Sequence, residues 1–239
     1  MIVRSEGAMA SSEHVTAHRV PRPWGTYWAK PVGWILSRTL WRVEVHGAHN
    51  VPRFGRTIMA ANHAGLVDGP LVFGCVPRRA HFLVKGAFFK GALGILMRAA
   101  GQIPVRRGEG RTTLEMARAI LERNDAVGIF PEGTRGRGDA ARLHHGVGWL
   151  AVHTDTPVIP IAVLGTRGTG KSVSALPRVR GRIVLVCGEP VAPVRGVDDA
   201  ESVRLTTTAV GTALQTLIAQ SEVTYGVRLP EDDPRAGAK

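Results

Sequence analysis

A histidine and a carboxylate lie five residues apart in the segment Asn-His-Ala-Gly-Leu-Val-Asp, residues 62–68. An apolar run that predicts a short buried strand comes directly before it. His63 is a natural general base, because an imidazole titrates near neutral pH. If the chain turns between them, Asp68 can fix the tautomer of that imidazole and stabilise its protonated form. The pattern predicts proton abstraction from a substrate hydroxyl, and a helix cap beside a surface histidine is the alternative.

Basic side chains follow two further apolar segments. Arg135 ends the run Phe-Pro-Glu-Gly-Thr-Arg, and Arg106 and Arg107 end the run Gly-Gln-Ile-Pro-Val-Arg-Arg. A guanidinium can hold a phosphate through two parallel hydrogen bonds, so these loops predict a substrate that carries a phosphate. The alternatives are a solvated charge cluster for Arg106 and Arg107, and a helix cap or arginine partner for Glu132.

Apolar strands alternate with helical patterns along the part of the chain that must position these residues. The expected strands cover 43–47, 57–61, 81–84, 126–130, 158–163 and 182–187, and the expected helices cover 68–76, 86–100, 112–124, 147–154 and 202–221. This alternation predicts a single α/β domain with a mostly parallel mixed sheet flanked by helices. In such sheets reactive groups gather beyond the carboxyl ends of the strands, which is where the histidine and the arginines are expected.

The segment 24–42 differs in kind from the alternating region. Pro31 can open a helix here, with apolar residues on one face and basic residues beside them. Tryptophans and basic residues on an amphipathic helix suit the headgroup layer of a membrane, and a helix packed on the body with its tryptophans in the core is the alternative. The residues concerned are Trp24, Trp28, Trp34 and Trp41, the apolar Val32, Ile35, Leu36 and Leu40, and the basic Lys30, Arg38 and Arg42.

The composition is that of an ordinary globular protein with an excess of positive charge. The chain has 239 residues, 44% of them hydrophobic, and a formal net charge of +12. The excess lies within residues 1–195, so anionic lipid, a phosphate-bearing substrate and nucleic acid are all candidate partners. No nucleic-acid-binding motif is recognisable, which argues against the last. Neither a transmembrane segment nor a signal peptide is expected, so the sequence predicts a cytoplasmic protein, peripheral on a membrane.

Cysteine and histidine usage gives no sign of a disulfide framework or a metal. The two cysteines, Cys75 and Cys187, are expected as buried thiols in a reducing compartment. His144 and His145 are adjacent, so their side chains face apart on most elements, and no third ligand is visible. We therefore expect no metal site.

A second motif points to a different class of enzyme. Residues 165–172 read Gly-Thr-Arg-Gly-Thr-Gly-Lys-Ser, which matches the phosphate-binding loop of nucleotide hydrolases and places Lys171 on the phosphates. Pro177 comes too soon for the helix that should follow such a loop, and the next strand ends without an aspartate for magnesium. A basic, glycine-rich surface loop is the favoured interpretation, and Lys171 can still meet anionic lipid or the phosphates of coenzyme A.

The order of four motifs resembles the glycerolipid acyltransferases of the 1-acyl-sn-glycerol-3-phosphate acyltransferase type. They are Asn-His-x-x-x-x-Asp, Gly-x-Ile-Pro-Val-x-Arg, Phe-Pro-Glu-Gly-Thr-Arg and Val-Ile-Pro-Ile-Ala, and the resemblance runs from about Val43 to Val191. It implies a membrane-associated O-acyltransferase of phospholipid biosynthesis. The acceptor by default would be 1-acyl-sn-glycerol 3-phosphate, giving phosphatidic acid. The donor would be acyl-CoA or acyl-ACP as a co-substrate, with no cofactor, and acyl carrier protein is a further candidate partner.

The resemblance also implies a role for each matching residue. His63 would be the base, Asp68 its orienting partner, and the absence of a neighbouring serine or cysteine nucleophile favours direct attack by the acceptor hydroxyl. The residues expected at the substrate are Asn62, which shapes the turn, Arg106 and Arg107 at the phosphate, Glu132, Gly133, Thr134 and Arg135 at the acceptor, and Pro160 on the donor side.

Two positions depart from the pattern of that family. Gly65 stands where serine is frequent, and Leu143-His144-His145-Gly146 stands where a basic residue often precedes the glycine.

The expected organisation is a flexible N-terminal tail at 1–23, the membrane-surface helix at 24–42, an acyltransferase domain at 43–229 and a C-terminal tail at 230–239. A lipid-surface module without catalysis is the alternative from outside the enzymes.

Overall fold

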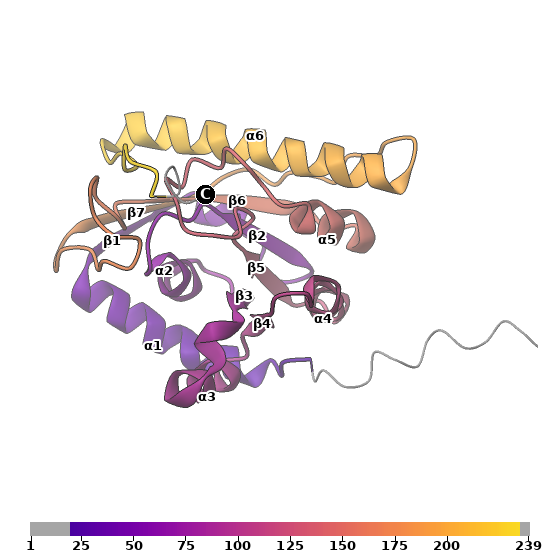
Figure 1. The fold of residues 1–239 in the computed structure, drawn as a ribbon, viewed down its shortest axis with the longest axis horizontal. Coiled ribbons are helices and arrows are strands. Elements are labelled where there is room, and N and C mark those ends of the chain that lie inside the picture. Colours follow the sequence, from indigo (N-terminus) through magenta and orange to yellow (C-terminus); the bar gives the residue numbers. More distant parts are fainter. Residues whose placement is uncertain (1–19, 235–239) are drawn as a thin grey trace, which may run out of the picture.

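A seven-stranded sheet forms the centre of the protein in the computed structural model, which describes residues 20–234 (Figure 1). The strands are β1 (Arg42–His46), β2 (Thr57–Ala61), β3 (His81–Lys85), β4 (Ile103–Val105), β5 (Ala126–Ile129), β6 (Val158–Leu164) and β7 (Arg182–Cys187). Their order across the sheet is β1-β7-β6-β2-β5-β3-β4, and every pair is parallel except β6 with β7. The predicted fold class, a single α/β domain with a mostly parallel mixed sheet, is confirmed.

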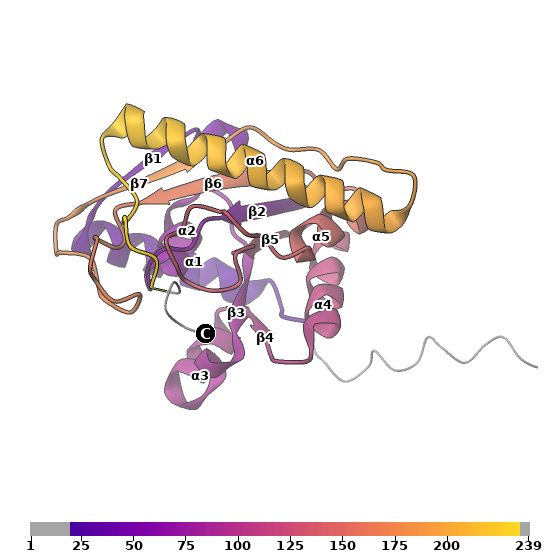
Figure 2. The same cartoon turned by 45° about the horizontal axis from the view of Figure 1, so that its top comes forward.

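Helices cover both faces of this sheet, as Figures 1 and 2 show from two directions. They are α1 (Trp24–Leu40), α2 (Asp68–Cys75), α3 (Gly91–Ala99), α4 (Gly110–Glu122), α5 (Gly146–Thr154) and α6 (Asp199–Tyr225), with short 3-10 turns η1 (Ala48–Asn50) and η2 (Gly86–Phe89). Alternate residues of β2 show how the faces divide. Met59 packs in the core beneath α2, whereas Ile58 and Ala60 pack beneath α4 and α5.

Helix α1 lies within the segment 24–42, where a helix was expected, but Pro31 lies inside it, seven residues after its start, and not at its first position. It buries a narrow face of small residues instead of its large apolar side chains. A Cβ added to Gly74 of α2 would lie 2.6 Å from the backbone of Gly33, so the two helices touch through their main chains. The buried residues of α1 are Gly25, Thr26, Ala29 and Ser37. The interpretation of this segment as a helix with its tryptophans in the core is therefore wrong for Trp24 and Trp34, which are 58% and 48% exposed.

Lys30 was expected to lend positive charge to the headgroup-facing side of α1, and the structure corrects this. Its ammonium group donates hydrogen bonds to the carbonyls of Gly74 and Val76 at the end of α2. Burial lowers the pKa of Lys30 below its ordinary value. Cations are favourable at a helix C-terminus, so Lys30 fastens α1 to α2. Trp41, just after α1, is also buried, and its indole N–H donates to the carbonyl of Pro177.

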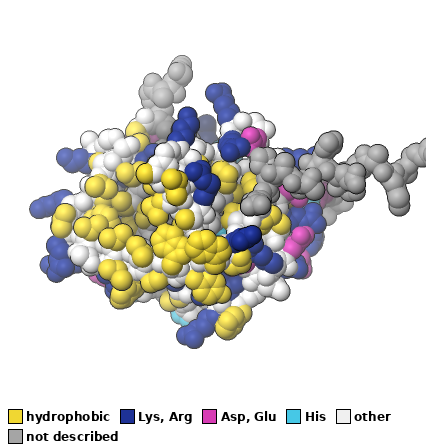
Figure 3. Space-filling view, turned by 90° about the horizontal axis from the view of Figure 1, so that it is seen from below, with side chains coloured by type: hydrophobic (Ala, Val, Ile, Leu, Met, Phe, Trp, Pro, Cys, Tyr) yellow, Lys and Arg dark blue, Asp and Glu magenta, His cyan; other side chains and the backbone are white. Residues whose placement is uncertain are grey.

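The large apolar side chains of α1 form an exposed surface together with those of α3. The expected helix 86–100 is in fact η2 followed by α3. The two helical turns are not continuous, because α3 begins at Gly91, whose φ is +55°. A Cβ on Gly25 would lie 2.2 Å from the carbonyl oxygen of Ala99, so α3 ends against the start of α1. Figure 3 shows the apolar surface from below, with Lys and Arg side chains around it. We call this surface the apolar face; its members are Trp24, Tyr27, Val32, Trp34, Ile35, Leu36, Leu40, Leu93, Ile95 and Leu96.

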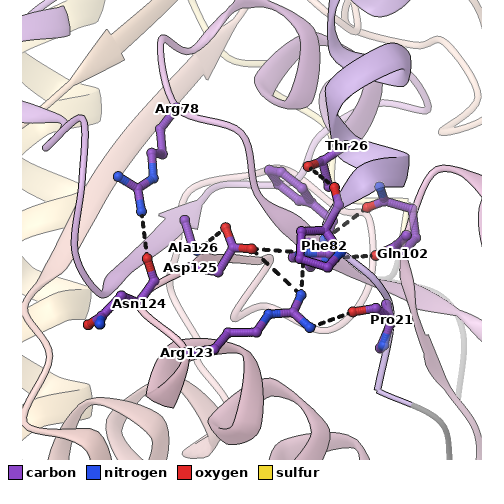
Figure 4. Close-up of polar contacts among 12 residues, drawn as sticks. Pro21, Thr26, Arg78, Phe82, Gln102, Arg123, Asn124, Asp125 and Ala126 are labelled. Atoms are coloured by element: carbon purple, nitrogen blue, oxygen red, sulfur yellow. Dashed lines mark hydrogen bonds and ion pairs between the residues drawn. The ribbon is translucent and has the colours of Figure 1, made fainter.

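A buried polar cluster ties the start of the described chain to the sheet (Figure 4). His81 of β3 is fully buried, and its ring nitrogens contact the carbonyl of Gly101 and the guanidinium of Arg123. Arg123 also donates to the carbonyl of Pro21 at 2.7 Å. Of the N-terminal tail expected at 1–23, residues 1–19 lie outside the described part, and Pro21 is held by this contact.

Both cysteines are buried, as predicted, and burial raises the pKa of the Cys187 thiol to about 12. Within residues 20–234, no helix is long and apolar enough to cross a bilayer. The same residues contain no group of three or more His, Cys, Asp and Glu side chains arranged to hold a metal ion.

Candidate active site

The carboxyl ends of five parallel strands meet at one edge of the sheet. These strands are β6, β2, β5, β3 and β4, in that spatial order. The chain leaves β2 at Asn62-His63 and β5 at Phe130-Pro131, and it leaves β4 at Arg106. The sheet therefore brings three of the sequence motifs to the same edge, because parallel neighbours end on the same side.

His63 and Asp68 form a close pair at the end of β2. The Nδ1 atom of His63 lies 2.8 Å from Oδ2 of Asp68, which is fully buried. The same carboxylate oxygen accepts the backbone N–H groups of Ala64 and Gly65, each at 2.8 Å. Asp68 therefore closes the turn between β2 and α2. An ionised carboxylate accepts only, so Nδ1 carries the proton and Nε2 keeps a lone pair for a substrate.

Two residues of the Phe-Pro-Glu-Gly-Thr-Arg motif hold His63 from other directions. The ring of Phe130 stacks on the imidazole with centroids 4.2 Å apart. Glu132, which is 3% exposed, accepts the backbone N–H of His63 at 2.8 Å through Oε1. The side chain of His63 remains 18% exposed, so a substrate can reach it. Glu132 was expected at the acceptor, and the structure places its carboxylate behind the histidine.

Asn62 is fully buried, and its side chain bonds only to backbone groups. Its Nδ2 donates to the carbonyls of Gly138 and Val163, and its Oδ1 accepts the N–H of Val163 at 2.7 Å. These bonds join the end of β2 to the end of β6 and to the loop after Arg135. The side chain therefore fixes the turn that presents His63, and it does not reach an open surface.

The arginines expected at a phosphate lie on two separate loops. Arg135 is half-buried, and its Nη1 donates to the carbonyl of Val173 at 3.0 Å. Arg106 and Arg107 are exposed after β4, and Arg106 lies 3.6 Å from Glu109. Since β4 stands three strands from β2, their backbones are roughly 14 Å across the sheet from that of His63, from a strand spacing of ~4.8 Å. A substrate that met both loops would have to span this edge.

The remaining expected site residues divide between this edge and the opposite side of β6. Gly133, with φ +70°, and Thr134 are exposed in the loop before Arg135. Pro160 is buried in β6, accepts the N–H of Gly188 at 2.9 Å through its carbonyl and lines a groove of about 460 Å³ along α6, so the structure does not bring it to His63.

The departure from the acyltransferase pattern at Gly65 has a steric explanation. A Cβ at Gly65 would lie 2.9 Å from the carbonyl oxygen of Thr166, so serine does not fit there without a shift of the main chain. His144 lies against the loop at residues 133–135, as shown by the 2.6 Å that would separate its ring from a Cβ at Gly133. Sequence reasoning missed this contact of His144, and its position two residues before Gly146, in the segment that departs from the family pattern, was the available signal.

The loop at 165–173 does not have the architecture of a nucleotide-binding loop. No helix follows it, since the chain runs irregularly from Gly165 to β7. Its buried arginine, Arg167, pairs with Asp232 at 2.7 Å, and the N–H of Gly170 donates to the same carboxylate. A phosphate-binding loop needs its N–H groups at a helix start, so the alternative based on Lys171 loses its structural context.

The chain is thus an α/β protein with a paired histidine and aspartate at the end of β2. The family model named Acyltransferase matches residues 42–164, and the chain belongs to this family. It is an enzyme of the acyltransferase class. The resemblance derived from the four motifs is thereby confirmed.

Characterised relatives carry the name expected from the motifs. The 1-acyl-sn-glycerol-3-phosphate acyltransferase of Bacillus subtilis is 29% identical over 62% of this chain and 73% of its own length. Human 1-acyl-sn-glycerol-3-phosphate acyltransferase alpha is 30% identical over 51% of this chain, which is 45% of its own length. The crystal structure of the 1-acyl-sn-glycerophosphate acyltransferase PlsC from Thermotoga maritima superposes with a TM-score of 0.59, covering 81% of this chain and 78% of that one at 24% identity. The fold is therefore that of PlsC.

Proposed function

We propose that this protein transfers a fatty acyl group from a thioester, acyl-CoA or acyl-ACP, to the hydroxyl of 1-acyl-sn-glycerol 3-phosphate. The observation that carries the proposal is the 2.8 Å contact of His63 with Asp68 at a strand end, on the edge that also carries Arg135. The names of the relatives from Bacillus subtilis and human support the choice of acceptor. The family membership supports the reaction type.

In the proposed mechanism, His63 acts as the general base. Its Nε2 accepts the proton of the acceptor hydroxyl as the oxygen attacks the thioester carbonyl. Asp68 stabilises the resulting imidazolium through Nδ1. When the carbon–sulfur bond breaks, the imidazolium returns the proton to the thiolate. The products are an ester and a thiol, and no covalent enzyme intermediate forms.

A colour assay for thiol release across acyl donors and acceptors tests this function. We expect release from acyl-CoA or acyl-ACP that depends on the acceptor and is fastest with 1-acyl-sn-glycerol 3-phosphate. Glycerol 3-phosphate and a lysophospholipid with a larger headgroup serve as alternative acceptors. A protein that binds vesicles but releases no thiol with any donor and acceptor would instead be a lipid-surface module.

Arg107 and Arg135 are proposed to bind the phosphate of the acceptor. Replacing either by alanine is expected to raise KM for 1-acyl-sn-glycerol 3-phosphate by about tenfold or more, because a charge-assisted hydrogen bond contributes roughly 1.5–3 kcal/mol. Activity toward a neutral monoacylglycerol should change little. Arg137→Ala removes an exposed arginine nearby and is the matched control. Equal KM values in the variants and the wild type would remove the phosphate contact from the mechanism.

The apolar face is proposed to rest on an anionic membrane, with the protein peripheral on the inner face of the plasma membrane. Ten large side chains are exposed on α1 and α3, and Figure 3 shows basic side chains around them. Exposed apolar surface of this kind on a basic protein favours the headgroup layer of anionic lipid. Both the acceptor and the product have chains that lie in the bilayer, so this contact would bring the site to its substrates.

A further inference from the structure

The segment that follows α6 binds the loop after β6, as Figure 2 shows for the yellow chain beside the orange loop. Leu229 is buried in the core beneath α6, and its N–H donates to Glu222 at 2.6 Å. The N–H of Glu231 then donates to the hydroxyl of Thr169. We call residues 229–234 the C-terminal strap. Part of the tail expected at 230–239 is therefore fixed, and residues 235–239 lie outside the described part.

The contacts of the strap converge on the carboxylate of Asp232. Its Oδ1 accepts the N–H of Gly170 at 2.9 Å, and its Oδ2 accepts Nη1 of Arg167 at 2.7 Å. The carbonyl of Asp232 accepts Nη2 of the same arginine at 2.9 Å. The Gly170 N–H and then Arg167 hold the pKa of the Asp232 carboxyl below its ordinary value, so the group is charged at neutral pH.

Arg167 connects this carboxylate to the loop that carries Arg135. Its side chain has no exposed surface, and its Nη2 also donates to the carbonyl of Gly136 at 3.2 Å. The N–H of Gly136 donates in turn to the carbonyl of His63 at 3.0 Å. Arg135 itself donates to Val173, which belongs to the same stretch after β6. The loop at residues 133–137 is thus held, at Arg135 and at Gly136, by the segment 165–173, which the strap fixes.

We propose that Arg167 and Asp232 are positioning residues, through which the C-terminal strap holds Arg135 in place for the acceptor. This inference rests on the proposed function. A buried guanidinium without its carboxylate is costly, so loss of the Asp232 charge would displace Arg167 and release the carbonyl of Gly136. The imidazole of His63 is held by Asp68 and Phe130 and its backbone N–H by Glu132, so the chemical step should be spared although its carbonyl accepts the N–H of Gly136.

The test compares D232N with E231Q in the full-length protein. E231Q removes the same charge one residue away while leaving its bound backbone N–H intact. We expect D232N to raise KM for 1-acyl-sn-glycerol 3-phosphate about tenfold with kcat changed less than about twofold, and E231Q to keep wild-type values. R167K keeps the charge but cannot reach both partners, and it should behave like D232N. Wild-type KM in D232N and R167K would overturn the proposal.

Hydrogen exchange separates this inference from the proposed activity. In D232N the backbone amides of residues 133–137 should exchange about tenfold faster, while those of β2 stay protected. If the wild type releases no thiol, the proposed function fails, and the exchange measurement still decides the role of the strap. Unchanged exchange would overturn that role. A D232N chain that does not fold would overturn it as well, because the strap would then support the whole domain instead of one loop.

Discussion

Replacing His63 by alanine is expected to lower the rate of thiol release by about 10³-fold or more, because no other group takes the proton from the acceptor. The fold should survive, since the imidazole is partly exposed and its backbone N–H still donates to Glu132. The measurement is kcat in the thiol-release assay, with circular dichroism melts of both proteins. KM for the acceptor should change little, because the arginines remain.

His49→Ala is the matched control for this variant, since it removes an exposed histidine in η1. Asp68→Asn, measured in the same assay, tests the charge of the carboxylate beside His63. The asparagine can still accept the N–H of Ala64 and Gly65, but it no longer stabilises an imidazolium. A His63→Ala protein that kept full activity would rule out proton abstraction by this residue.

Serine at Trp34, Ile35 and Leu36 together is expected to lower the affinity for vesicles of phosphatidylcholine and phosphatidylglycerol by about 100-fold. Each side chain is about half exposed, so lipid would bury further surface worth roughly 1 kcal/mol per residue. Folding stability should hardly change, because α1 packs through its small residues. Sedimentation with vesicles measures the affinity, and a thermal melt checks the fold.

Serine at Val197 and Val223 provides a control for general loss of surface hydrophobicity. These residues are 94% and 87% exposed, and they lie before and within α6, on the other side of the sheet. Vesicle binding should be unaffected in this control. Equal binding by the triple variant and the wild type would mean that the apolar face does not contact lipid.

Sequence reasoning located six of the seven strands and the histidine–aspartate pair because both depend on local patterns, and it did not assign β4 as a strand. β2 and β7 have the predicted bounds, since uninterrupted apolar runs in an α/β protein become buried strands. The sequence analysis predicted a mostly parallel sheet but no order for its strands. That β4 would lie at an edge, three strands from β2, depends on how crossovers arrange the chain in space.

The errors of the sequence interpretation concern what side chains face. Glu132 looks like a ligand for a substrate, yet its Oε1 accepts the backbone N–H of His63, and no local signal distinguishes the two uses. Asn62 was expected at the substrate and in the shaping of the turn, and its bonds to backbone groups fit the second of these. The sequence did not decide which face of α1 is exposed, because its helical pattern offers two faces. The stripe of Gly25, Ala29 and Gly33 at intervals of four was the clue to the buried one, since only small residues permit contact between main chains.

Helix α2 connects α1 with the turn that carries His63 and Asp68. Lys30 binds the carbonyls at its last turn, and Asp68 stands at its first residue, eight residues or about 12 Å away. A rigid rod of that length leaves no hinge between α1, the helix proposed to contact lipid, and Asp68, the carboxylate proposed to orient His63. On a bilayer the imidazole would therefore stand at a constant height, and only hydroxyl groups presented at that height would come within its reach.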